Sequence, residues 1–285
     1  MLEAVRPARV LRALTADRHI RFTAMDASPL WDGVRRGHPH HEADACANLV
    51  ELLSAALLLQ SRTFFSERLQ LALQGTGRIK ALVADSWPEG DIRGILDLAQ
   101  DGVDRPWIDG PGSFRVMRSN PRGQPYIGTL ELLGGGIQAQ LEAYLLQSEQ
   151  VQSSATLWCD PGTGEAGALF VEPMPGCPRE RLGKVVDAIE GLDVVPLWER
   201  DPGFLCRWIN QGDGTEILSS TEIRYHCRCR KETLVEILRG FEAPKLDEIF
   251  HEGGPAEVCC DYCGRAYLIR REDLASGGDG NHAQP

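Results

Sequence analysis

The sequence lacks an excess of positive charge. It contains 30 Lys and Arg residues against 41 Asp and Glu residues, which gives a formal net charge of −11. An acidic protein repels phosphate backbones, so we expect no nucleic-acid partner. Apolar residues make up 42% and charged residues 25% of the chain, a balance typical of folded globular proteins rather than disordered ones.

Long hydrophobic runs are missing as well. The longest apolar stretch, Leu52–Leu59, is too short to span a bilayer and is flanked by Glu51, Gln60 and Arg62. The first residues, Met1–Pro7, do not combine a basic segment with an apolar one as a signal peptide does. We therefore expect a cytoplasmic protein without a membrane partner. In that compartment clustered cysteines more often bind metal or undergo redox chemistry than form structural disulfides.

Patterns of enzyme active sites are also absent from the sequence. The Gly134–Gly136 run is not followed by the Gly-Lys-Ser/Thr of a phosphate-binding loop. We find no convincing Ser/His/Asp set. We interpret the histidine-rich stretch His38–His41 as an exposed loop rather than a metal site. The sequence therefore predicts a protein without catalytic turnover.

The apolar pattern that is present predicts an α+β fold with an N-terminal mixed α/β core domain. Helical spacing predicts a buried helix over residues 43–61 and another helix over residues 137–150. Short apolar or alternating stretches predict strands at residues 69–74, 79–83, 92–98, 114–117 and 168–171. A cluster of prolines between residues 173 and 178 closes this core domain, which we assign to residues 1–178.

A linker region is expected next, over residues 179–224. Within it, Leu182, Val185, Val186 and Ile189 lie at positions i, i+3, i+4 and i+7 and predict one apolar stripe on a short helix. Such a stripe fits an ordinary core helix, and it also fits a helical linker that docks between domains.

The C-terminal part predicts a compact unit over residues 225–275. Two short helices are expected at residues 231–239 and 246–251, followed by a hairpin at residues 257–270. The Gly-rich residues 276–285 predict a disordered tail.

Four of the chain's nine cysteines form two close pairs within this unit. Cys227 and Cys229 make a Cys-x-Cys pair, and Cys260 and Cys263 make a Cys-x-x-Cys pair thirty residues further on. Two such pairs, one from each of two chain segments, are typical of a tetrahedral four-thiolate zinc site. We therefore predict one Zn²⁺ per chain, bound by these four residues. Two structural disulfides would instead require an oxidising compartment, which this sequence does not indicate.

The sequence leaves one alternative for the ligand set, because a further cysteine adjoins the second pair. Cys259 adjoins Cys260 and offers a Cys-x-x-x-Cys spacing, but the turn Cys260–Gly264 matches the metal-binding pattern better. The lone cysteines are interpreted as small apolar fillers; they are Cys46, Cys159, Cys177 and Cys206. Basic residues are expected to cluster around the site and offset its negative charge; they are Arg224, His226, Arg228, Arg230, Lys231 and Arg265.

A unit of about fifty residues with few large apolar side chains seldom folds without a covalent or metal link. Structural zinc contributes roughly 10–16 kcal/mol of apparent folding free energy in small zinc peptides. Loss of the metal is therefore expected to unfold the whole unit, so the site can act as a switch.

At these residues the sequence resembles the thirty-three-kilodalton heat-shock protein family, the redox-regulated, ATP-independent holdase chaperones of bacteria. Its two cysteine signatures are similar to the segments Tyr225–Arg230 and Cys260–Tyr267. Further similar segments cover nearly the whole chain; they are Leu71–Gly77, Leu82–Asp85, Tyr144–Gln150 and Ala166–Gly176.

The resemblance implies a chaperone that is zinc-bound, inactive and monomeric when reduced. Oxidation would form the disulfides Cys227–Cys229 and Cys260–Cys263, release zinc, and expose a surface that binds unfolding client proteins, with formation of a homodimer. The sequence departs from the family in a shorter segment between Ile189 and Trp208 and in two extra thiols, Cys206 and Cys259.

Two other classes of function compete with this interpretation. One is a zinc-ribbon adaptor that binds a protein or a nucleic acid, but the acidic charge and the lack of interleaved aromatic and basic residues argue against nucleic acid. The other is a thiol oxidoreductase or zinc hydrolase. Residues 260–263 do not begin a helix after a strand, as a thioredoxin-type site would, and four cysteine ligands leave zinc no position for a catalytic water.

Overall fold

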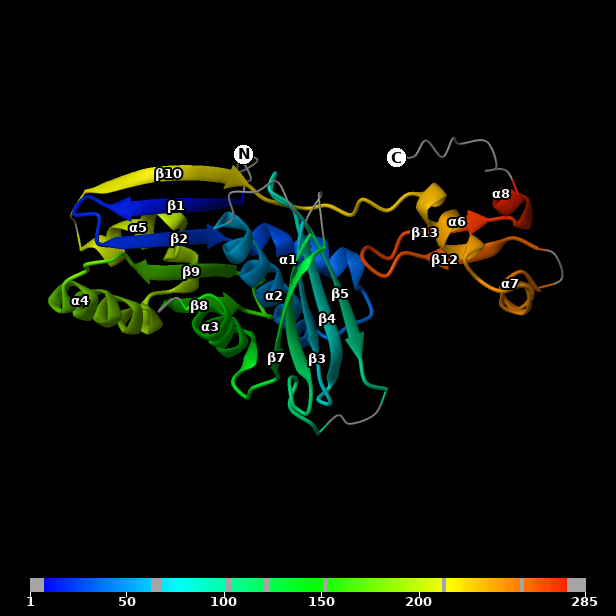
Figure 1. Cartoon of the computed structure of the whole chain (residues 1–285), viewed down its shortest axis with the longest axis horizontal. Helices are drawn as coiled ribbons and strands as arrows, with labels where there is room; N and C mark the ends of the chain where they lie inside the picture. Colours follow the sequence, from blue (N-terminus) through cyan, green and yellow to red (C-terminus); the bar gives the residue numbers. More distant parts are fainter. Residues whose placement is uncertain are drawn as a thin grey trace. The chain divides into compact units, whose positions relative to one another are not determined.

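The computed structural model describes residues 8–62, 68–100, 104–119, 124–150, 153–211, 214–251 and 254–275. The chain divides into two compact units, Met1–His226 and Cys227–Pro285. Figure 1 shows the helices and strands of both units. Each unit has its own hydrophobic core.

The first unit contains a five-stranded antiparallel sheet whose middle strands are buried on both faces. Its strand order is β10 (Thr215–Glu222), β1 (Arg9–Thr15), β2 (Ile20–Asp26), β9 (Ala166–Pro173) and β8 (Ser154–Cys159). Successive residues of β9 alternate between two cores: Phe170 belongs to one, and Leu169 and Val171 to the other. This double burial explains why β9 is apolar almost throughout.

A second sheet in the same unit has six strands. Their order is β11 (Arg224–Tyr225), β5 (Asp91–Leu98), β4 (Ile79–Ser86), β3 (Leu69–Gln74), β6 (Ser113–Arg118) and β7 (Tyr126–Glu131). All neighbours pair antiparallel except β11, which runs parallel to β5. The short strand β11 thus fixes the end of the first unit at a sheet edge.

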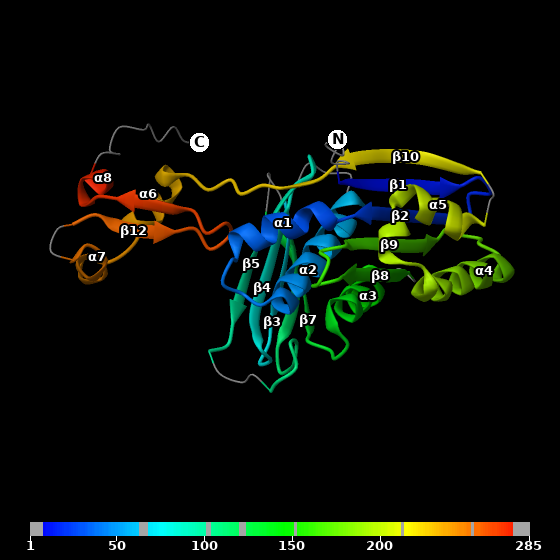
Figure 2. The same ribbon diagram turned by 180° about the vertical axis from the view of Figure 1, so that it is seen from behind.

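Helix α2 (Ala43–Ser61) is the central helix of the first unit and contacts strands of both sheets. Helices α1 (Ser28–Gly37) and α3 (Gly136–Ser148) pack beside it. Figure 2 shows α1 and α2 from the side opposite to Figure 1. In the described part of the chain α2 alone is long and apolar enough to cross a membrane, but 78% of its apolar window is buried inside the protein. The helix extends beyond the apolar stretch Leu52–Leu59 and includes the half-buried residues Asn48 and Glu51.

Residues 179–224 form helical segments followed by a strand. They comprise α4 (Arg179–Glu190), η1 (Gly191–Val194), η2 (Leu197–Glu199), α5 (Pro202–Asn210) and β10. The predicted apolar stripe lies on α4, where Val185 is buried in the second core of the first unit, whereas Val186 is 44% exposed. Strand β10, which was not predicted, pairs along its whole length with β1.

The second unit is small. It contains α6 (Lys231–Arg239), α7 (Ala243–Ile249), β12 (Ala256–Cys259), β13 (Ala266–Ile269) and α8 (Arg271–Ala275). The predicted helix at residues 231–239 and the predicted hairpin are confirmed, while the second helix begins three residues earlier than expected. Its core has five buried residues, Val235, Leu238, Phe250, Ala256 and Ile269. The tail predicted over residues 276–285 lies outside the described residues.

Candidate metal centre

The first cysteine pair lies on the segment that joins the two units. Strand β11 holds the start of this segment, since the His226 N–H donates to the Ile92 carbonyl at 2.8 Å. Cys227 and Cys229 follow in a stretch without helix or strand, and α6 begins at Lys231. The pair is therefore confined between two regular elements that are only a few residues apart.

The second pair lies in the turn between β12 and β13. The N–H groups of Cys263 and Gly264 donate to the Cys260 carbonyl at 3.2 and 2.8 Å, and the Cys260 N–H donates to the Arg265 carbonyl at 3.0 Å. Gly264 has a φ of 67°, a left-handed conformation that favours glycine because it has no Cβ. This tight turn brings the two side chains of the Cys-x-x-Cys pair to the same side.

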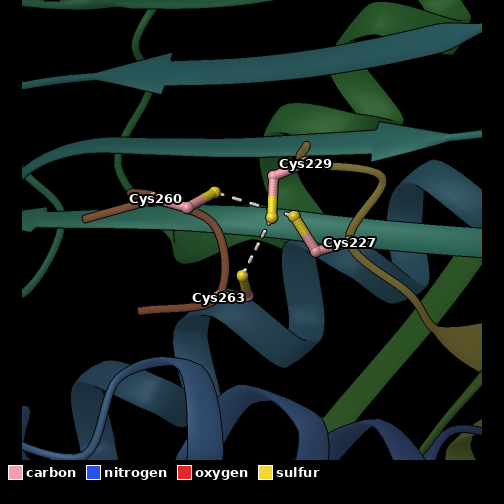
Figure 3. Close-up of side chains that lie close together, drawn as sticks. All are labelled: Cys227, Cys229, Cys260 and Cys263. Atoms are coloured by element: carbon pink, nitrogen blue, oxygen red, sulfur yellow. Dashed lines mark hydrogen bonds between the residues drawn. The ribbon is translucent and has the colours of Figure 1, made fainter. Parts of the chain in front are cut away.

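The structure brings all four predicted sulfurs together, within 4.8 Å of one another (Figure 3). The closest sulfurs come from different segments: Cys227 and Cys260 lie 3.7 Å apart, and Cys229 and Cys263 lie 3.5 Å apart. Four thiolates bound at about 2.3 Å to a tetrahedral zinc ion would lie about 3.8 Å from one another. The cluster can therefore hold a metal ion, and its soft sulfur donors and spacing suit zinc.

The remaining cysteines lie outside the cluster. Cys259 is exposed at the end of β12, whereas Cys260, the first residue of the following turn, is buried. Of the four lone cysteines, Cys46 and Cys206 are buried in the first unit, and Cys159 and Cys177 are partly exposed. The only group of three or more metal-ligating side chains among the described residues is the four-cysteine cluster.

The prediction that His38–His41 is an exposed loop was wrong for His38. His38 is only 5% exposed, and its Nε2 lies 3.2 Å from the Gly94 carbonyl of β5. The neighbouring turn residue His40 is exposed, as expected for a loop. Sequence reasoning missed the burial of His38 because the partner strand is more than fifty residues away.

Tyr267 is a residue of the site that sequence reasoning did not single out. Its hydroxyl oxygen lies 3.1 Å from the Cys229 Sγ and donates to the Cys229 carbonyl at 3.2 Å. It is placed there by β13, whose pairing sets Tyr267 opposite Val258 of β12. The only sequence signal is an aromatic residue four positions after Cys263, which by itself has no specific meaning.

The surroundings shift the pKa values of three of the clustered thiols, and not all in the same direction. Burial raises the pKa values of Cys260 and Cys263. Burial acts in the same direction on Cys229, but hydrogen bonds from Tyr267 and the neighbouring thiols outweigh it and lower its pKa. Because a bound metal cation favours thiolates, metal binding at this cluster would release protons.

Three of the basic residues expected around the site have identified partners. Arg224 pairs with Asp91 of the first unit at 2.5 Å, and Lys231 pairs with Asp273 at 2.7 Å, so both charges are partly neutralised by carboxylates. Arg265 has a side-chain hydrogen bond with Tyr267 and is thereby linked to the cluster.

Comparison with known proteins bears on the identity of the chain. The family model described as Hsp33 protein matches residues 8–270. A 33 kDa chaperonin of Thermus thermophilus is 30% identical over 94% of this chain and 86% of that protein. A 33 kDa chaperonin of Bacillus subtilis is 26% identical over 93% of this chain and 96% of that protein.

Solved structures give the same result for the fold. The crystal structure of a 33 kDa chaperonin from Thermotoga maritima matches with a TM-score of 0.79 and 23% identity, over 95% of this chain and 97% of the other. The α+β fold expected from the sequence is thus confirmed. Because the family model spans nearly the whole sequence, the chain belongs to the Hsp33 family of chaperones.

Proposed function

We propose that this protein is a redox-regulated, ATP-independent holdase whose switch is the four-cysteine cluster. The observation that carries this proposal is the convergence of four sulfurs from two chain segments within 4.8 Å. In the reduced state Cys227, Cys229, Cys260 and Cys263 would hold one Zn²⁺, which links the start of the second unit to its hairpin. With zinc bound the protein would be inactive and monomeric.

Oxidation supplies the proposed switching step. A peroxide accepts two electrons from each pair of thiolates, so two equivalents of hydrogen peroxide and four protons yield two disulfides and four water molecules. Following the family resemblance, we propose the pairs Cys227–Cys229 and Cys260–Cys263. A disulfide sulfur no longer offers a thiolate, so oxidation releases the metal.

The small core of the second unit supports the proposal that this unit unfolds when the metal is released. Five buried residues, one of them an alanine, leave the unit dependent on the metal for its stability. We propose that the second unit unfolds, that the region 179–224 loses support, and that apolar surface then binds unfolding client proteins, with dimerisation. In this arrangement residues 1–178 form the core domain, residues 225–275 the switch, and residues 276–285 a tail.

The proposal is tested by comparing the reduced and oxidised protein. Hypochlorous acid with mild heat should release about one zinc per chain, measured with a colorimetric chelator. The oxidised protein should suppress aggregation of an unrelated unfolding protein without ATP, and the reduced protein should not. Equal suppression in both states would exclude a redox switch.

Peptide mapping without reductant tests the proposed disulfides separately. Near neighbours are the expected pairs, although the shortest sulfur separations in the cluster are those of Cys227 with Cys260 and Cys229 with Cys263. Disulfides between these distant residues would keep the two segments linked and would contradict unfolding of the unit.

A matched pair of variants tests the ligand set. Cys260→Ser removes a clustered sulfur and should lower zinc affinity by more than the roughly 10–100-fold typical of losing an outer-shell partner. Cys259→Ser removes the adjacent exposed thiol and should leave zinc binding unchanged. Zinc loss in Cys259→Ser, measured by competition with a chelator of known affinity, would show that the wrong thiol was assigned.

A further inference from the structure

A cavity of about 180 Å³ lies in the first unit, and none of the four clustered cysteines lines it. One wall is formed by two cross-strand pairs, Val10 with Thr221 and Arg12 with Ser219, which join β1 to β10. The opposite wall is formed by the end of α2 and by the turn between β4 and β5, which contributes Trp87. The cavity is therefore lined by elements of the first unit alone, and one of these elements, β10, belongs to the region 179–224.

Arg12 is the charged residue of this cavity. Its side chain is half-buried and has no hydrogen bond or ion pair with any described residue. Burial lowers the pKa of Arg12, and the guanidinium groups of Arg21 and Arg62 lower it further, against the opposing effect of Glu172. A guanidinium in such a place costs free energy unless an anion accompanies it.

The neighbouring carboxylates are already engaged. Glu172 accepts hydrogen bonds from Arg21 at 2.7 Å and from Arg62 at 3.1 Å. Glu149 is shared by Arg62 at 3.0 Å and Arg118 at 2.5 Å. The Nε atoms of Arg62 and Arg118 are buried and have no hydrogen-bond partner among the described residues.

The described residues around this site carry an excess of positive charge. Arg12 and the three arginines of these ion pairs are accompanied by two carboxylates, Glu149 and Glu172, so positive charges exceed negative ones by two in this part of a protein whose net charge is −11. The C-terminus of α2 contributes about half a negative charge and does not offset this excess.

We propose that this cavity binds an inorganic oxyanion of the size and charge of the phosphate dianion. Arg12 would bind two of its oxygens, because the planar guanidinium fits phosphate oxygens in pairs. The hydroxyl groups of Ser219 and Thr221, on the same half-buried face of β10, supply further donors. The cavity volume exceeds the room needed for a single water molecule and accommodates a four-oxygen ion.

Calorimetric titration of the full, reduced, zinc-loaded chain with sodium phosphate at low ionic strength tests the site. One phosphate should bind per chain, and Arg12→Gln should weaken binding by about 10–100-fold, the effect of removing a charge-assisted hydrogen bond. Arg9→Gln is the matched control, because Arg9 lies on the same strand but is exposed. It should leave the affinity unchanged.

Thermal unfolding distinguishes lost binding from lost structure. Without phosphate, Arg12→Gln should melt no lower than the unmodified chain, because the substitution removes like-charge repulsion. Phosphate should raise the melting temperature of the unmodified chain and of Arg9→Gln, but not that of Arg12→Gln. Absence of saturable phosphate binding, or equal affinity in Arg12→Gln, would overturn the proposal.

A second titration separates a free ion from a phosphoryl group carried by a larger molecule. Phenyl phosphate presents the same oxygens with a bulky substituent and should bind more weakly than inorganic phosphate in a cavity of this volume. Tighter binding of phenyl phosphate would contradict the assignment of a free inorganic ion.

Discussion

At the scale of single residues, the candidate metal centre has side chains that contact the sulfurs in addition to the sulfurs themselves. Tyr267 contacts both the sulfur and the carbonyl of Cys229, and Arg265 in turn bonds to Tyr267. Such outer contacts orient a ligand and stabilise its thiolate form. The cluster is thus linked to β13 by a tyrosine side chain in addition to the backbone turn.

Removing the Tyr267 hydroxyl should therefore weaken the metal site without destroying it. Tyr267→Phe is expected to lower zinc affinity by roughly 10–100-fold, the usual effect of losing an outer-shell partner. Competition with a chelator of known affinity measures this change. Tyr126→Phe removes a hydroxyl in the first unit and serves as the control. Unchanged zinc affinity in Tyr267→Phe would show that the contact to Cys229 has no influence on the metal.

A second residue-scale prediction concerns pH. Burial raises the pKa of Glu51, on α2, to about 7. The folded state therefore holds this proton more tightly than the unfolded state, and stability falls as pH rises from the ordinary glutamate range through 7. Glu51→Gln removes this penalty and should stabilise the protein by about 1–3 kcal/mol at pH 8 but not at pH 4. Urea unfolding at both pH values measures the difference, and equal effects would contradict the raised pKa.

At the scale of elements, strand β11 connects the first unit to the first cysteine pair. Tyr225 of β11 packs against Gly33 of α1 so closely that a Cβ on Gly33 would lie 2.4 Å from the Tyr225 Cβ. The Tyr225 hydroxyl also donates to the Gly94 carbonyl of β5 at 3.3 Å. Helix α1 and strand β5 together therefore determine where this strand can lie.

This packing predicts opposite effects for two helical glycines. Gly33→Ala should displace β11 and destabilise the first unit by about 1–3 kcal/mol, as overpacking does. Gly183→Ala, on α4, meets no atom within 4 Å and should stabilise the helix by roughly 0.5–1 kcal/mol. Urea unfolding of the two variants gives the comparison. A stabilised Gly33→Ala would mean that β11 is not held by α1.

The elements differ in how well the sequence predicts them. Helix α2 was predicted with the correct ends because its apolar residues repeat at helical spacing. Strand β10 was missed because it is mostly polar: its sequence is Thr-Glu-Ile-Leu-Ser-Ser-Thr-Glu. It lies at an exposed edge of the sheet, and its residues Ser219 and Thr221 line the cavity rather than an apolar core. Strand β11 has two residues and depends on β5, which lies more than a hundred residues earlier. No local sequence pattern indicates pairing between strands so far apart in the chain.

The candidate site was more predictable than the fold around it. Cysteine is rare enough that the two short spacings alone singled out the four residues that the structure brings together. The role of Tyr267 depends on the register of β12 and β13, and the burial of His38 depends on β5. Both are tertiary contacts between residues whose local sequence gives no indication of them.

At the scale of the whole molecule, the two units differ in how their stability arises. The first unit has two extensive apolar cores, whereas the described part of the second has an apolar core of five buried residues and four clustered sulfurs. Structural zinc contributes roughly 10–16 kcal/mol in small zinc peptides, so loss of a metal ion from this cluster is expected to affect the second unit far more than the first.

Chelation should unfold the second unit and leave the part of the first unit around α2 and β9 folded. After treatment with a strong zinc chelator, amides of α6 and of the β12–β13 hairpin should exchange rapidly with deuterium, while those of α2 and β9 stay protected. Hydrogen exchange read by mass spectrometry resolves the two regions, and restoring zinc should restore protection. Retained protection of α6 after complete zinc removal would contradict the metal dependence of this unit.

The position of α2 between two sheets has a consequence for synthesis on the ribosome. Strand β9, which covers one side of α2, begins roughly 100 residues after the helix ends. At about 5–20 residues per second, the nascent chain carries this apolar helix for about 5–20 s before β9 has been translated. During that interval the chain is itself an unfolded polypeptide with an uncovered apolar segment, so newly made copies need protection from aggregation until the second half of the first unit emerges.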